Sequence, residues 1–152
     1  MEKASIKNYF ELFGLKPKFD INVDDLTDRY LRLQSSSHPD CYHDVGSKRD
    51  IQSNAILINE AYQTLKSPLR RAEYLLSFML KAYDVMKPTQ DLLMEIMEMR
   101  EQVKGEDPFL NEAYNTCIED IKAAFDNNDT YDMAYNAMKL KYITKIKEDI
   151  CN

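Results

Sequence analysis

The sequence predicts an all-α protein made of two helical domains. Apolar residues recur along most of the chain at the spacing of amphipathic helices. Only three glycines and five prolines occur among the 152 residues, too few for the turns of a many-stranded β fold. Hydrophobic residues make up 44% and charged residues 30%, which is typical of a globular protein.

An antiparallel helical hairpin is predicted in the first half of the chain, after a short apolar helix at about residues 8–15. Asp24 or Asp25 is the expected cap of the first long helix. The apolar stripe of this helix consists of Leu26, Tyr30 and Leu33. The helix must end before Pro39, because proline disfavours helical geometry in the residue that precedes it.

The second helix of the hairpin has the most regular apolar spacing in the chain. Its stripe consists of Ile51, Ala55, Ile58, Tyr62 and Leu65. Two apolar stripes joined by a polar loop indicate that the two helices pack against each other. Ser67 and Pro68 then suit the cap and the first position of another helix, which is expected to run to Leu80.

A domain boundary is predicted at residues 81–87, a linker that separates a first domain, 1–80, from a second domain, 88–152. Three helices are expected in the second domain, at about residues 89–104, 108–126 and 130–150. The loops between them are short, so neighbouring helices must run antiparallel. The second domain is therefore predicted to be an antiparallel three-helix bundle.

The charge distribution argues against nucleic acid and membrane partners. The net charge is −6, and the excess lies in residues 81–152, which hold 15 acidic and 9 basic residues. No tract of lysine or arginine is present to bind a phosphate backbone or an anionic membrane surface. The longest apolar stretch, residues 74–80, is far shorter than a membrane span.

The cysteines and the N-terminal residues predict the compartment. Cys41, Cys117 and Cys151 are odd in number and far apart, which favours free thiols in a reducing environment. The first residues resemble neither a signal peptide nor a transit peptide. We expect a cytoplasmic protein, or a mitochondrial matrix protein if a leader has been removed.

One loop concentrates the groups that could perform chemistry. His38, Asp40, Cys41 and His43 could bind zinc, but no outside pair of ligands completes the usual spacing. A cysteine–histidine nucleophile would need an orienting group and an oxyanion pocket, which nothing in the sequence marks. Phosphate-binding loops, metalloprotease motifs and EF-hand loops are missing from the sequence. We therefore expect no enzyme activity, no cofactor and no metal site.

The same loop carries a resemblance to a known family. His38-Pro39-Asp40 between two hairpin helices resembles the tripeptide of J-domains, which are co-chaperones of seventy-kilodalton heat-shock ATPases. Residues 9–15 (YFELFGL) resemble the opening turn of that domain, and residues 58–65 (INEAYQTL), followed by Ser67-Pro68, resemble the end of its third helix. Residues 69–76 (LRRAEYLL) and 93–101 are similar to HscB, the J-protein family of iron–sulfur cluster assembly.

The resemblance implies a co-chaperone that delivers an iron–sulfur scaffold of the IscU type to an HscA- or DnaK-type chaperone and stimulates its ATPase. Pro39 makes the tripeptide a rigid corner, which can present the Asp40 carboxylate to an arginine of the chaperone. The expected chaperone-binding residues are His38, Pro39, Asp40, Arg29 and Arg32. The chain departs from J-domains at Ser35–Ser37, where they carry basic residues, and at Cys41, where they commonly carry lysine.

Helical periodicity places a second apolar face on the helix at about 89–104. Leu92, Ile96, Met99 and Val103 form a narrow stripe suited to a bundle core. Leu93, Met94 and Met97 lie nearly opposite, next to Glu98 and Glu101. This face either packs on the first domain or binds another protein.

In HscB-like proteins the matching residues are implied to hold the scaffold: Leu93, Met94, Met97, Glu98 and Glu101, with Tyr142 as a further aromatic contact. Tyr142 shares a stripe with Tyr135 and Met138, so a core role is equally expected for it. Two other hypotheses remain open from the sequence. One is a generic helical adaptor without a chaperone partner, and the other is a small thiol- or metal-dependent enzyme.

Overall fold

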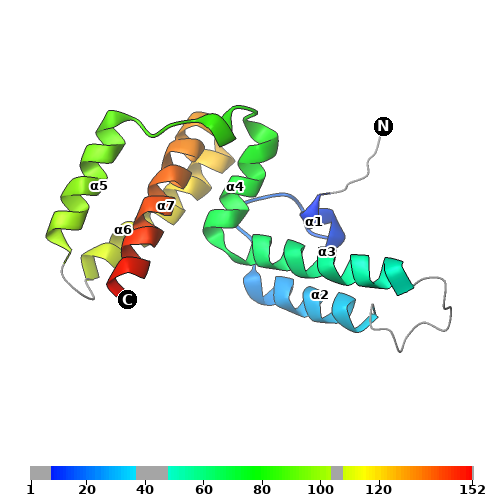
Figure 1. Ribbon diagram of the computed structural model, residues 1–152. Coiled ribbons are helices and arrows are strands. Elements are labelled where there is room, and N and C mark those ends of the chain that lie inside the picture. Colours follow the sequence, from blue (N-terminus) through cyan, green and yellow to red (C-terminus); the bar gives the residue numbers. More distant parts are fainter. Residues whose placement is uncertain (1–7, 37–47, 104–107, 152) are drawn as a thin grey trace. The chain divides into compact units, whose positions relative to one another are not determined.

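The all-α class is confirmed. The computed structural model describes residues 8–36, 48–103 and 108–151, and within these ranges every regular element is a helix (Figure 1). None of the described helices is long and apolar enough to cross a membrane.

The chain divides into two compact units, residues 1–71 and 72–152. This division falls within α4 (Pro68–Met79) and not at residues 81–87, where we expected a linker. The helix continues through the division because Pro68 stands at its first position and its next eleven residues include neither glycine nor proline. The expected linker lies inside the second unit, and part of it forms a short 3₁₀ helix, η3 (Tyr83–Val85).

The first unit contains α1 (Tyr9–Leu12), α2 (Val23–Ser36), α3 (Lys48–Lys66) and the first residues of α4. Helices α2 and α3 run antiparallel, as predicted, and α1 packs on α3. The cap of α2 is Asn22 and not Asp24 or Asp25, since the Asn22 side chain accepts a hydrogen bond from the Asp25 backbone N–H at 3.1 Å. The helix thus begins earlier than the aspartates suggested.

Stacked aromatic rings hold the hairpin together. The rings of Tyr30 and Tyr62 lie 4.0 Å apart and nearly parallel, and the Tyr62 hydroxyl lies 3.0 Å from that of Thr27. Of the predicted α3 stripe, Ile58, Tyr62 and Leu65 are buried. Ala55 is exposed, and the side chain of Ile51 lies outside the described residues.

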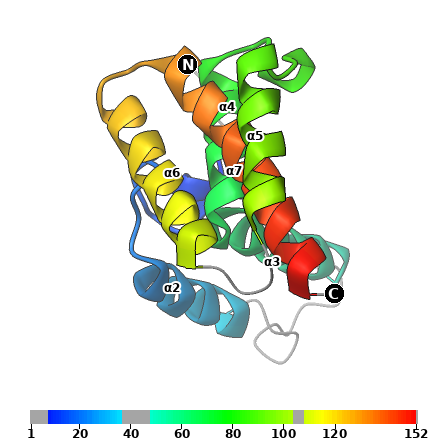
Figure 2. The same ribbon diagram turned by 90° about the vertical axis from the view of Figure 1, so that its left-hand side faces the viewer.

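The second unit contains the rest of α4, then η3, α5 (Gln90–Gln102), α6 (Pro108–Asp126) and α7 (Thr130–Cys151). Helix α7 lies between α5 and α6 and packs against both (Figure 2). Helix α6 runs antiparallel to both α5 and α7, which confirms the predicted order of the three helices. Asp129 caps α7 by accepting the Asp132 N–H at 3.1 Å.

The core of this bundle depends on α7. Eight of its side chains are buried: Met133, Ala134, Asn136, Ala137, Met138, Leu140, Ile143 and Ile146. Each large apolar side chain removed from water stabilises the fold by about 1.5–3 kcal/mol.

Leu140→Ala should lower the free energy of unfolding by about 2–5 kcal/mol, because Leu140 is fully buried and its loss leaves a cavity. Chemical denaturation measures the loss. Leu93→Ala is the matched control, since it removes the same atoms from an exposed position and should cost less than about 1 kcal/mol. Equal losses for the two variants would contradict the assignment of the core to α7.

Candidate functional site

The predicted tripeptide His38-Pro39-Asp40 lies outside the described residues, as do Cys41 and His43. The hypothetical zinc or thiol site falls on this same segment. The structure describes the two helix ends that residues 37–47 connect, Ser36 of α2 and Lys48 of α3, at the same end of the hairpin (Figure 1). Within the described ranges, no group of three or more histidine, cysteine or acidic side chains could hold a metal ion.

Arg29 has a structural role that its sequence position did not reveal. Its Nη1 donates to the backbone carbonyls of Phe13, at 2.8 Å, and Gly14, at 3.4 Å. Its Nε donates to the Asp25 carboxylate at 3.1 Å. Gly14 has a φ of +67°, and a Cβ atom there would lie 3.2 Å from the same Nη1. Arg29 therefore holds the turn after α1 against α2, whereas Arg32 is exposed on α2.

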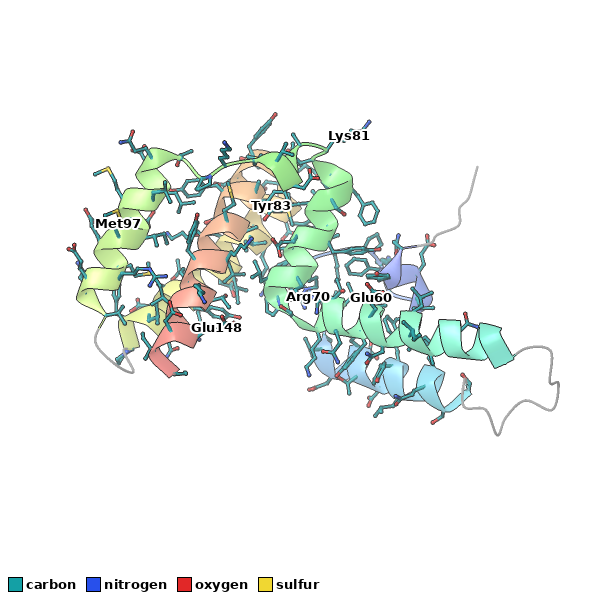
Figure 3. All side chains as sticks on the ribbon, viewed as in Figure 1. Glu60, Arg70, Lys81, Tyr83, Met97 and Glu148 are labelled. Atoms are coloured by element: carbon teal, nitrogen blue, oxygen red, sulfur yellow. The ribbon has the colours of Figure 1, made fainter. Side chains whose placement is uncertain are left out.

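The second apolar face of α5 is exposed. Leu93, Met94 and Met97 keep 40%, 55% and 63% of their surface open to solvent, and the neighbouring Glu98 and Glu101 are exposed as well. Met97 lies on the side of α5 that faces away from α7 (Figure 3). The opposite stripe is buried, as the periodicity predicted, at Leu92, Ile96 and Met99.

Tyr142 lies on a neighbouring helix and is half-buried. It shares one face of α7 with Tyr135 and Lys139, since residues three, four and seven apart lie on the same side of a helix. Both of those side chains contact α5, so Tyr142 stands on the side of α7 that is turned toward α5. Met138, which we expected on the same stripe, is buried.

Polar contacts between α5 and α7 were missed by the sequence reasoning. Lys139 Nζ lies 2.6 Å from Glu95 Oε1, and the Tyr135 hydroxyl donates to Glu95 Oε2 at 3.4 Å. Burial lowers the pKa of Lys139, but the hydrogen bond and the charge of Glu95 outweigh it, so the pKa lies above its ordinary value. Burial and the charge of Glu95 both raise the pKa of Tyr135. These partners are separated by at least 40 residues, which hydrophobic periodicity does not connect.

The two described cysteines, Cys117 and Cys151, are free thiols. Cys117 is buried in α6, where its thiol donates to the Asn136 carbonyl at 3.0 Å. Burial raises the pKa of this thiol to about 12, so almost none of the nucleophilic thiolate exists near neutral pH. Cys151 is exposed at the end of α7.

Comparisons with known proteins agree with the fold. Residues 109–151 match the family described as the HSCB C-terminal oligomerisation domain. The chain is 32% identical to the co-chaperone protein HscB homolog of Shewanella amazonensis, and the match covers 94% of each chain. It is 33% identical to the co-chaperone protein HscB of Proteus mirabilis, over 94% of this chain and 93% of that one.

Solved structures give the same result. The chaperone HscB from Vibrio cholerae superimposes with a TM-score of 0.79 at 32% identity and 95% coverage of both chains. Human HscB shares the fold, with a TM-score of 0.84 at 24% identity, over 98% of this chain and 83% of that one. The Shewanella amazonensis and Proteus mirabilis relatives are both named as co-chaperones. By sequence identity over nearly its whole length, the chain belongs to the HscB family of co-chaperones.

Proposed function

We propose that this co-chaperone brings an iron–sulfur scaffold protein of the IscU type to an HscA- or DnaK-type chaperone and stimulates the chaperone's ATPase. Its role is thus in the assembly and transfer of iron–sulfur clusters. The observation that carries the proposal is the exposed apolar face of α5, at the positions where HscB-like proteins are implied to hold the scaffold.

The α5 face has the chemistry of a protein-binding surface. Leu93, Met94 and Met97 are large apolar side chains that share one side of a helix and remain exposed. Methionine side chains are flexible and polarizable, so they adapt to the surface of a partner. Glu98 and Glu101 border this face and would complement basic groups at the rim of the scaffold. Half-buried Tyr142 extends the surface onto α7.

The chaperone-binding part of the proposal rests on the tripeptide. The ring of Pro39 limits its backbone, and the Asp40 carboxylate can accept a charge-assisted hydrogen bond from an arginine of the chaperone. Hydrolysis belongs to the chaperone, whose conformational equilibrium this protein shifts by binding one state better. Arg32, exposed on α2, adds a positive charge that favours the encounter with the chaperone. Arg29 holds the turn after α1 in place within the first unit.

Asp40→Asn should abolish most of the ATPase stimulation, because it removes the charge and keeps the size of the side chain. The fold should be unaffected, since an amide has nearly the same shape as the carboxylate that it replaces. Steady-state ATP hydrolysis by the cognate chaperone is the measurement. Asp84→Asn, an exposed aspartate of the second unit, is the matched control and should stimulate normally. Full stimulation by Asp40→Asn would rule out this mechanism.

Changing Leu93, Met94 and Met97 together to alanine should weaken scaffold binding about a hundredfold or more, because truncating buried interface anchors costs several kcal/mol in sum. Isothermal titration calorimetry with the purified scaffold measures the affinity. Stimulation of the chaperone in the absence of scaffold should persist.

The control variant is Val85→Ala with Tyr131→Ala, which removes exposed apolar surface of the same unit outside the α5 face. Unchanged scaffold affinity in the triple variant would place the scaffold site elsewhere. A wild-type chain that binds the scaffold but never accelerates hydrolysis would be an adaptor and not the co-chaperone proposed.

A further inference from the structure

Helix α5 is anchored by few buried side chains. It buries Leu92, Ile96 and Met99, whereas α7 buries eight side chains. Its main packing partner is α7. The orientation of the apolar face on α5 therefore depends on how α5 is seated on that one helix.

Two ion pairs join α5 to α7. In the first, both carboxylate oxygens of Glu95 are engaged, one by Lys139 and the other by Tyr135. In the second, Arg100 Nη1 lies 3.4 Å from Asp149 Oδ2. The first is shorter and better shielded, since the Lys139 side chain is only 20% exposed.

These pairs lie on opposite edges of the buried stripe. At about 100° per residue, Glu95 falls roughly 40° to one side of Met99. Arg100 falls roughly 40° beyond Ile96 on the other side. A rotation of α5 that relaxed one pair would stretch the other, so together they oppose rotation about the helix axis.

We propose that Lys139 is a positioning residue that, through Glu95, fixes the rotation of α5 and so presents Leu93, Met94 and Met97 to the scaffold. The inference rests on the proposed function and names a residue that does not itself belong to the apolar face. Lys139 lies one turn before Tyr142 on α7, so the same contact sets the spacing between Tyr142 and the α5 face.

Lys139→Leu and Glu95→Gln should each weaken scaffold binding about fivefold in calorimetry, an effect typical of losing a coupled pair. ATPase stimulation without scaffold should be unchanged. The exchanged variant, Glu95→Lys with Lys139→Glu, should bind within about twofold of wild type, because it restores the pair with the charges reversed. Lys122→Leu is the control, since its ion pair with Glu119 lies within α6 and does not reach α5.

A measurement on the free protein distinguishes a positioning role of Lys139 from direct contact with the scaffold and from a general effect on stability. Methyl NMR of the methionines should show shifted signals for Met94, Met97 and Met99 in both single variants and near wild-type signals in the exchanged variant. Wild-type affinity in the single variants would overturn the inference. So would failure of the exchanged variant to recover, because Lys139 would then contact the scaffold itself. A lowered melting temperature with unchanged affinity and methyl signals would also overturn it.

If Lys139→Leu does not fold, the Glu95→Gln variant tests the inference instead. The Glu95 side chain is 42% exposed, and the substitution keeps its size. If the wild-type chain does not bind the scaffold at all, the proposed function is wrong. The methyl signals then still decide whether the pair fixes α5, and unchanged signals in Glu95→Gln would overturn that as well.

Discussion

Helix α7 lies between α5 and α6, and the second unit depends on the side chains that it buries there. Ala134 and Ala137 are fully buried, and their small size lets neighbouring helices approach closely. The polar Asn136 is buried at little cost because its side-chain amide donates to the Asp132 carbonyl at 2.9 Å. Its own backbone carbonyl accepts from the Cys117 thiol, so α6 and α7 are joined by a hydrogen bond as well as by apolar packing.

This arrangement explains why α5 has an exposed apolar face. A helix that packs mainly on one neighbour buries one stripe, and Leu92, Ile96 and Met99 fill that stripe. The side chains of Leu93, Met94 and Met97 lie on the opposite side and keep 40–63% of their surface open to solvent. Three large apolar residues exposed together are costly for solubility, so their presence favours a binding role.

The sequence predicted what depends on local periodicity and missed what depends on distant contacts. The order of the helices and the two faces of α5 follow from apolar spacing, and both are confirmed. The contacts of Arg29 with the turn after α1, and of Glu95 with Lys139, join residues that are far apart in the sequence, and ionic residues carry no periodic signal. The two compact units divide within α4, whereas Pro88 suggested a later boundary, and the predicted domain bounds stay a prediction. The tripeptide was found as a motif, and its role stays a prediction.

Charge and apolar surface have different consequences for the proposed scaffold complex. The acidic excess of residues 81–152 would attract a basic partner over a distance of about one Debye length, roughly 8 Å at physiological ionic strength. Such attraction raises the rate of association, whereas the desolvated apolar contacts of the α5 face slow dissociation. Because both the scaffold and the chaperone would bind one chain, binding the first raises the effective concentration of the second. In the proposed complex, two weak contacts on one chain would therefore together hold the scaffold near the chaperone.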